Sequence, residues 1–311
     1  MKISVITPVY NAEKYITQAV ESALQFEEVH EVILVEDQSP DNALEVCETL
    51  VAKYQERVKL FQHADKGNHG AGASRNLAIS KATGDFIAFL DADDYYLPNR
   101  FDAERELFKN PTIEGVFGAI GTEFLTEKGK EDFQKKFKNT ELTTVKKPAE
   151  GNDVFYGLLG LNQDFGTFFH LNGLTIRTES IRKNLLRFNP ELRVHQDSDF
   201  IVKLSYYCYL KSGNITEAVA MRGVHDDNRI TQIQNYSDKY NQRQALLWSS
   251  INQWAKDKEI KPEYKDHIHL KNQAFQLSQL SGLKKWITLA LAILRNPKIL
   301  KTRYRFIYLG M

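Results

Sequence analysis

Short apolar runs alternate with amphipathic stretches through the first hundred residues, and this alternation restricts the fold more than any other feature. The apolar runs are rich in β-branched residues and occupy 2–7, 31–36, 58–62 and 85–90. Runs of this length and composition are typical of buried strands. The segments between them carry apolar residues at helical spacing. Strands and helices in this order build an open α/β sheet, mostly parallel, with crossover helices.

Polar residues and prolines mark where the intervening helices are expected to begin. Asn11 is a candidate N-cap for the first helix, and Pro40 is expected to begin the second, with Asp41 as its cap. A glycine-rich loop, GNHGAGAS, precedes a third predicted helix near Ser74–Lys81. These starts follow the carboxyl ends of the strands, which is the edge where open α/β sheets bind ligands.

The pattern changes beyond the first hundred residues. Residues 126–150 are polar and lysine-rich, so we expect a surface excursion there and no packed element. Mixed apolar segments return after this stretch, and from about Tyr236 the pattern is helical to the end. We therefore predict an α/β catalytic domain in 1–225 and a helical extension in 226–311.

Composition excludes several classes of protein. The chain has 311 residues, 42% of them hydrophobic, and a formal charge of +1, which argues against nucleic acid as the main partner. Its two cysteines, Cys47 and Cys208, lie far apart among apolar residues, so we expect buried thiols and no disulfide or zinc site. The N-terminus breaks too early at Pro8 for a signal peptide, and no apolar run reaches about 18 residues. We expect a cytoplasmic protein.

The sequence DADD at 91–94 directly follows a predicted buried strand. It should meet Thr7–Asn11 and Asp37 at the carboxyl edge of the sheet. Asp91 and Asp93 alternate, so an extended strand would project both to one side. Carboxylates placed in this way hold Mg²⁺ together with substrate phosphates, and the cation neutralises a departing diphosphate. For the pair alone, an acidic helix N-terminus is the alternative.

Four further residues are candidates for chemistry, and each has a plain structural alternative. Asp37 can accept hydrogen bonds from a base or ribose, or it can belong to a turn. Arg75 can pair with phosphate or carboxylate, or its glycine-rich loop can be a flexible connector. Asp197, in QDSDF, can act as a general base or cap a helix, and Asp199 cannot share its helix face. His225, in RGVH, can ligate a metal or be structural.

In combination these segments resemble the large inverting glycosyltransferase family 2, whose members have the GT-A fold. The matching blocks, in order, are ITPVYNAEKYITQAVESAL, ILVEDQSPDNA, GAGASRNLAISKATGDFIAFLDADDYYLPNR, QDSDF and RGVH. The first three span most of residues 3–100, and the last two extend the resemblance to about residue 225. The combination is specific, although no single block is.

The resemblance implies a role for each matching residue. It implies a nucleotide site lined by Pro8, Tyr10, Asn11 and Asp37. Asp91 would contact the nucleotide sugar, with Arg75 as a candidate partner for phosphate. Asp93 would hold Mn²⁺ or Mg²⁺, and His225 would be a ligand of the metal or the diphosphate. Asp197 would be the general base of a single displacement that inverts the anomeric carbon.

Two departures from the family pattern affect this expectation. The family often has Asp-Asp-Gly-Ser where this chain has EDQS, so the resemblance does not give the exact loop conformation, although Asp37 is kept. The family often has Glu-Asp at the base motif, and Gln196 stands in the first place here. Asp197 therefore lacks an acidic neighbour that would raise its pKa.

The expected donor is a nucleoside-diphosphate sugar, with a UDP-sugar favoured. The expected acceptor is a saccharide or a lipid-linked molecule in the synthesis of cell-surface polysaccharide or glycolipid. A sugar nucleotidyltransferase is one alternative, but TPVYNAEKYI lacks the glycine-rich, arginine-containing signature expected after its first strand. A non-catalytic nucleotide-sugar-binding module is another, and it would keep Asp37 and Asp93 without needing Asp197.

Residues 284–305 combine a nine-residue apolar core, Trp286–Leu294, with flanking lysines and arginines. The core is too short to span a bilayer. A basic amphipathic segment can instead lie in a membrane interface. We therefore expect peripheral membrane contact through 284–311, at the inner face of the membrane. A helix that packs on the catalytic domain is the alternative.

Overall fold

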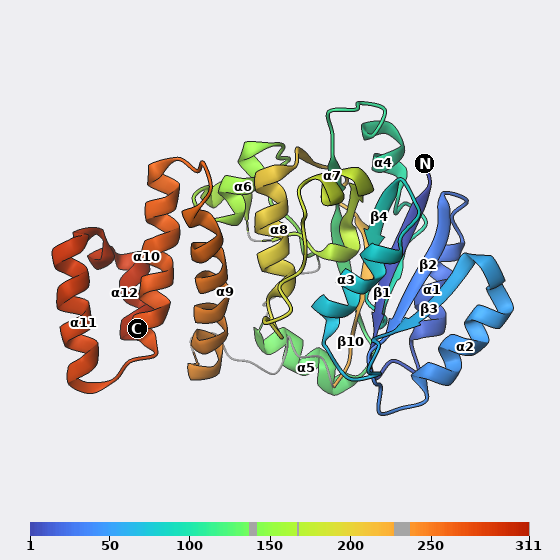
Figure 1. Cartoon of the computed structure of the whole chain (residues 1–311), viewed down its shortest axis with the longest axis horizontal. Coiled ribbons are helices and arrows are strands. Elements are labelled where there is room, and N and C mark those ends of the chain that lie inside the picture. Colours follow the sequence, from blue (N-terminus) through green and yellow to red (C-terminus); the bar gives the residue numbers. More distant parts are fainter. Residues whose placement is uncertain (137–141, 167, 227–236, 311) are drawn as a thin grey trace. The chain divides into compact units, whose positions relative to one another are not determined.

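The computed structural model describes residues 1–136, 142–166, 168–226 and 237–310 (Figure 1). The chain divides into two compact units, Met1–Asp227 and Asn228–Met311. Among the described residues, the first unit contains every strand, and the second contains helices only.

A seven-stranded sheet forms the centre of the first unit, in the order β3-β2-β1-β4-β8-β6-β9. The strands are β1 (Ile3–Val9), β2 (Val29–Glu36), β3 (Val58–Gln62), β4 (Phe86–Phe89), β6 (Gly115–Phe117), β8 (Leu174–Arg177) and β9 (Leu210–Ser212). Strands β1 to β4 are parallel, whereas β8 is antiparallel to its neighbours β4 and β6. The predicted open, mostly parallel sheet is therefore confirmed.

Helices cover both faces of this sheet, which explains why β1 and β2 are apolar along most of their length. Figure 1 shows α1 (Ile16–Leu24) and α2 (Ala43–Tyr54) on one face and α3 (Ala71–Lys81) on the other. Ile3, Val5 and Val9 of β1 join the core formed with α1 and α2. Both cysteines are buried thiols, as expected.

A buried carboxylate connects the parallel strands at the edge of the sheet away from their carboxyl ends. Glu31 of β2 is fully buried and ion-paired with Lys59 of β3 at 2.6 Å. It also accepts hydrogen bonds from the hydroxyl of Ser4 in β1 at 2.6 Å and from the backbone N–H of Thr83 at 2.7 Å. These contacts fix β1, β2, β3 and the approach to β4 together.

A second sheet of three strands adjoins the end of β4. It has the order β5-β10-β7, with β5 (Asp94–Tyr96), β7 (Ala119–Phe124) and β10 (Ala218–Val224). Strand β10 is antiparallel to β5, and Arg222 pairs with Asp94. The sequence RGVH is thereby brought beside DADD, although more than a hundred residues separate them.

Helices make up the remainder of both units. The first unit adds α4 (Asp102–Leu107), α5 (Glu127–Lys136), α6 (Asn152–Leu158), α7 (Thr178–Lys183) and α8 (Gln196–Tyr207). The second contains α9 (Asp238–Lys256), α10 (Pro262–Ser278), α11 (Gly282–Arg295) and α12 (Thr302–Leu309), so the predicted helical extension is present. None of the helices in the described ranges has the length and apolar content needed to cross a bilayer.

The helix starts differ from those predicted. Asn11 caps no helix: it takes a left-handed conformation (φ 53°), and α1 begins at Ile16 after Tyr15. Helix α2 begins at Ala43 and not at Pro40, and its N-cap residue is Asn42 and not Asp41. The Asp41 carboxylate accepts hydrogen bonds from the backbone N–H groups of Ala43 (3.3 Å) and Glu13 (2.8 Å). The residues before α1 and those before α2 are therefore held together by the hydrogen bond between Glu13 and Asp41.

The lysine-rich stretch 126–150 was expected to hold no packed element, and this is wrong for its first part. Residues 127–136 form α5, in which Phe133 is buried and packs edge-on against Phe124 of β7. One aromatic residue among many charges is enough to anchor an amphipathic helix. Residues 137–141 lie outside the described ranges.

Candidate active site

The carboxyl ends of β1, β2 and β4 bring the predicted nucleotide-site residues to one edge of the sheet. Val9 pairs with Glu36 across β1 and β2, and Ile6 pairs with Phe89 across β1 and β4. Pro8 lies inside β1 opposite Val35, so the strand continues one residue beyond the expected break. Tyr10 is 46% exposed, and Asn11 follows it in the turn.

Asp37 is buried and holds the glycine-rich loop. Its two carboxylate oxygens accept from the backbone N–H groups of His69 and Gly70, both at 2.7 Å. Gly70 has φ +86°, and a Cβ there would lie 2.7 Å from Nη1 of Arg193. Glycine is therefore required at this turn. The structure shows a loop-binding role for Asp37, and its contact with a nucleotide stays a prediction.

Arg75 and Asp91 form an ion pair beneath this loop. Arg75 lies in α3, is 5% exposed and places Nη2 2.5 Å from Oδ1 of Asp91. Burial alone would raise the pKa of Asp91, but the charge of Arg75 and its hydrogen bond, with the charge of Arg222, outweigh burial and lower that pKa. Asp91 is therefore ionised at neutral pH, and Arg75 supplies positive charge at the strand end.

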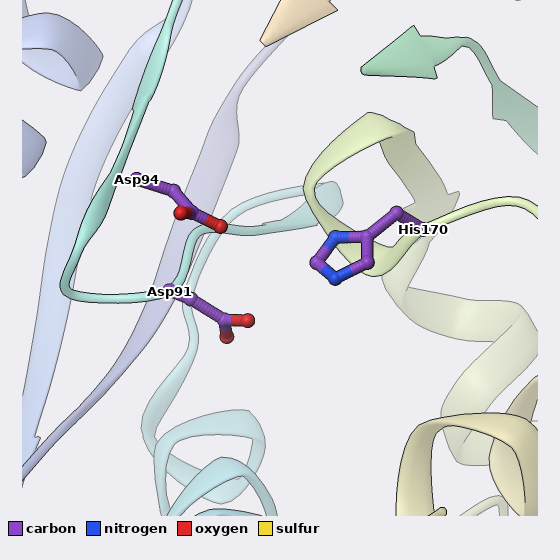
Figure 2. Close-up of side chains that lie close together, drawn as sticks. All are labelled: Asp91, Asp94 and His170. Carbon is purple, nitrogen blue, oxygen red and sulfur yellow. The ribbon is translucent and has the colours of Figure 1, made fainter. Parts of the chain in front are cut away.

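The chain turns after β4, and this turn decides which carboxylates meet. The backbone N–H of Asp94 donates to the carbonyl of Asp91 at 3.1 Å. Figure 2 shows the side chains of Asp91 and Asp94 directed toward the ring of His170, and ligand atoms of the three lie within 4.8 Å of one another. The expectation of an extended strand carrying Asp91 and Asp93 is therefore wrong, because β4 ends at Phe89 before them.

Burial favours the neutral forms of both Asp94 and His170, so their pKa values shift in opposite directions. Burial and the carboxylates of Asp93 and Asp91 raise the pKa of Asp94 well above its ordinary value. Desolvation, followed by the charge of Arg222, lowers the pKa of His170 to about 4. His170 is therefore neutral at pH 7. Its Nδ1 accepts from the backbone N–H of Asn172 at 3.3 Å, so Nε2 carries the ring proton.

Asp93 and His225 form a second, more open pair. Oδ2 of Asp93 lies 3.2 Å from Nε2 of His225, and their side chains are 31% and 11% exposed. The imidazole stacks on Tyr15 with a 5.0 Å centroid separation. Gly223 allows this approach, because a Cβ there would lie 2.5 Å from the carbonyl oxygen of Asp93. RGVH therefore needs its glycine to pass beside DADD.

The two acidic groups differ in how well they suit a divalent cation. In the first group Asp91 is paired with Arg75, and Asp94 accepts from Asn172 and from the backbone N–H of Gly223. With Arg222 nearby, that group has little net negative charge to offer. The carboxylate and imidazole of Asp93 and His225 are ligands that Mn²⁺ accepts, and their exposure leaves room for phosphate oxygens. The second pair is therefore the stronger candidate for a metal site.

Asp197 and Asp199 lie on different faces of α8, as helical geometry predicts. Asp199 is fully buried and ion-paired with Lys203 at 2.6 Å, which gives it a structural role. Asp197 lies in the first turn of α8, is partly exposed and acts electrostatically on His170. Helix α8 approaches α3 closely, since a Cβ at Gly72 would lie 2.0 Å from Oε1 of Gln196. Asp197 is thus within electrostatic reach of His170, whose ring lies close to Asp91 and Asp94.

Sequence reasoning gave no role in this site to Asp94 or Arg222, and it did not identify His170 or Asn172 at all. Asp94 and Arg222 stand inside motifs that were recognised, so pairing of β5 with β10 could have indicated them. His170 and Asn172 lie around a short 3₁₀ turn, Leu171–Gly173, in a segment with no motif. Nothing in their local sequence signals the site.

Comparison with known proteins shows which family of sequences this chain resembles. The sequence model described as Glycosyl transferase family 2 matches residues 4–166. An uncharacterized glycosyltransferase of Haemophilus influenzae is 41% identical over 103 residues, 33% of this chain and 40% of that protein. The minor teichoic acid biosynthesis protein GgaB of Bacillus subtilis is 34% identical over 149 residues, 46% of this chain and 16% of GgaB. This chain thus spans less than half the length of either relative.

Solved structures are similar over nearly the whole chain. S. aureus TarS 1–349, in complex with UDP-GlcNAc, has a TM-score of 0.62 at 20% identity, covering 99% of this chain and 84% of TarS 1–349. The mannosyltransferase PcManGT from Pyrobaculum calidifontis, with GDP-Man and Mn²⁺, has a TM-score of 0.55 at 17% identity, covering 99% and 83%. At these identities the likeness concerns the fold, which is GT-A. The family match spans more than half of the 311 residues, and the chain therefore belongs to glycosyltransferase family 2.

Proposed function

We propose that this protein transfers a sugar from a nucleoside-diphosphate sugar, with a UDP-sugar as donor, to a hydroxyl group of a saccharide or lipid-linked acceptor. The observation that carries the proposal is the presence of two chemically different groups near the DADD turn and His170. Asp93 and His225 lie 3.2 Å apart, and Asp197, in the first turn of α8, acts electrostatically on His170. A cation site and a separate carboxylate are what an inverting transfer requires.

The donor would bind along the carboxyl edge of the sheet. The exposed ring of Tyr10 offers a stacking surface for the base, and Pro8, Asn11 and Asp37 surround the same edge. Asp93 and His225 would hold Mn²⁺ or Mg²⁺, whose charge would stabilise the diphosphate that leaves. Arg75 keeps Asp91 ionised and oriented, so that this carboxylate can accept hydrogen bonds from hydroxyl groups of the sugar.

Asp197 would remove the proton from the acceptor hydroxyl. The oxygen then forms a bond to the anomeric carbon while the bond from that carbon to the diphosphate oxygen breaks, which inverts the configuration. Because His170 is neutral at pH 7, it places no positive charge beside Asp197. Substrate-bound TarS and the GgaB relative support a UDP-sugar donor and a cell-surface polysaccharide or glycolipid product.

Replacement of the base tests this proposal. Asp197→Asn should lower turnover by about 10²–10⁴ while donor affinity is nearly unchanged, because only the proton acceptor is removed. Asp153→Asn is a matched control, since Asp153 is an exposed acid in the first turn of α6. The donor is first found by thermal shift with uridine, guanosine and thymidine diphosphate sugars, and transfer is then measured with a labelled sugar.

The outcomes separate the alternatives. Donor binding without any transfer or hydrolysis by the wild-type protein would favour a non-catalytic module. Full activity of Asp197→Asn would remove the proposed base. If Asp199→Asn then lost activity at unchanged melting temperature, the role would move to Asp199.

A further inference from the structure

Helix α11 presents a stripe of large apolar side chains to solvent. Its exposed members, with their exposed fractions, are Leu283 (75%), Trp286 (57%), Ile287 (53%), Leu291 (50%) and Leu294 (82%). Spacings of three and four residues place them on one face of the helix. Leu289 and Ala292, on the opposite side, are buried. The two faces of α11 are therefore both apolar, and only one is covered within the described ranges.

An uncovered stripe of this kind differs from ordinary surface hydrophobicity. Proteins expose single apolar residues routinely, but a contiguous patch marks a site of interaction. Helix α9 of the same unit provides the contrast, because Leu246 is the only exposed large apolar residue among those described in that helix. We call the five α11 residues the apolar stripe.

Positive charge surrounds the apolar stripe. Residues 282–310 contain no aspartate or glutamate and seven cations: Lys284, Lys285, Arg295, Lys298, Lys301, Arg303 and Arg305. All but Lys285 are exposed. Lys284 and Arg295 border the stripe along one edge, because each is three or four residues from Ile287 or Leu291. An apolar face with a basic border complements a surface that is apolar below and anionic above.

We propose that α11 docks this protein on an anionic lipid surface, with the apolar stripe toward the acyl chains and Lys284 and Arg295 on the headgroups. The 14-residue helix is too short to span a bilayer and long enough to lie in the interface. A second copy of the chain is a poorer occupant, because a symmetric contact would bring two basic borders together with no acid between them. The proposal does not depend on the proposed chemistry, although it would place the enzyme beside a lipid-linked acceptor.

Co-sedimentation of the full chain with vesicles tests the proposal. Vesicles of phosphatidylcholine mixed with phosphatidylglycerol should bind the protein at low salt, and vesicles of phosphatidylcholine alone should bind it much less. Binding should weaken as salt rises, because headgroup attraction is screened. Lys284→Gln and Arg295→Gln should each weaken binding about fivefold, the equivalent of about 1 kcal/mol per cation.

Substitution of the stripe distinguishes insertion from simple charge attraction. The triple change Ile287→Gln, Leu291→Gln and Leu294→Gln should abolish sedimentation while leaving the melting temperature unchanged, because all three side chains are exposed. Leu246→Gln is the matched control, as an exposed leucine on α9, and should bind as the wild type does. Sugar transfer to a soluble acceptor should be unchanged in all of these variants.

Fluorescence gives a second readout. The chain has three tryptophans, and Trp286 is the exposed one, so vesicle binding should shift its emission to the blue. Trp286→Phe should remove the shift and keep the sedimentation. Absence of binding to the anionic vesicles at low salt, or equal binding by the triple variant, would overturn the proposal. A wild-type dimer that the triple variant converts to a monomer, with no vesicle binding by either, would assign the stripe to self-association instead.

Discussion

Replacing Gly223 by alanine should damage the candidate metal site and the fold together. The added Cβ would lie 2.5 Å from the carbonyl oxygen of Asp93 and 2.8 Å from Cδ1 of Leu125, whereas real Cβ contacts essentially never fall below 3.0 Å. Leu125 can move, but a backbone carbonyl cannot retreat without moving the DADD turn. The backbone N–H of Gly223 donates to Oδ1 of Asp94 at 2.9 Å, so a shift of β10 also weakens a buried hydrogen bond.

The size of the effect follows from these two contacts. Overpacking a tight site costs about 1–3 kcal/mol, and weakening a hydrogen bond to a buried carboxyl adds about 1–2 kcal/mol. For a unit of this size each kcal/mol lowers the melting temperature by about 2–4 °C, so we expect a decrease of roughly 4–20 °C. Because β10 carries His225 to Asp93, metal-dependent binding of nucleoside diphosphate should weaken as well.

Thermal unfolding followed by calorimetry, with and without Mn²⁺ and UDP, measures both effects. Gly67→Ala is the matched control, because a Cβ there would meet only the flexible side chain of Asp65 at 3.2 Å or more. A Gly223→Ala protein with the wild-type melting temperature and the wild-type response to Mn²⁺ would refute the close approach of β10 to the DADD turn.

Three further predictions address the metal, an acid-labile contact and the thiols. Asp93→Ala should abolish donor turnover and metal-dependent binding of nucleoside diphosphate, and calorimetric titration that finds donor binding with unchanged metal dependence would contradict the assignment. Glu31 has its pKa lowered from 4.5 to about 2: burial opposes this, but the hydrogen bonds from Lys59, Ser4 and Thr83 outweigh it. A lowered pKa in the folded state stabilises the protein above about pH 4.5, and this stabilisation is lost as pH falls toward 2. Glu31→Gln should therefore lower the free energy of unfolding by about 2–3 kcal/mol at pH 7. Urea unfolding should show that the difference between variant and wild type becomes smaller below pH 4.5. A difference that does not change with pH would contradict this prediction. Burial raises the pKa of both cysteine thiols to about 12, so neither should react with a thiol reagent in the folded protein at neutral pH, and both should react in denaturant.

The linear sequence determined the parallel part of the sheet and the edge of the sheet at which the candidate site lies. Buried parallel strands must be apolar on both faces, so each gives a nearly continuous apolar run that can be recognised even when one residue in it is polar. Because the carboxyl ends of such strands share one edge, Asp37 and the residues of DADD could be assigned to a common site. The different environments of Asp197 and Asp199 also followed from local geometry, since residues two apart lie on different faces of a helix.

Only the tertiary structure decided which side chains touch. DADD reads as a strand, but the chain turns after Leu90, so Asp91 meets Asp94 and His170 while Asp93 meets His225. That pairing depends on β10, which arrives from more than a hundred residues away and needs Gly223 to pass. The uncovered face of α11 is likewise a tertiary result: its sequence is apolar on both sides, and packing alone determines which side stays in solvent.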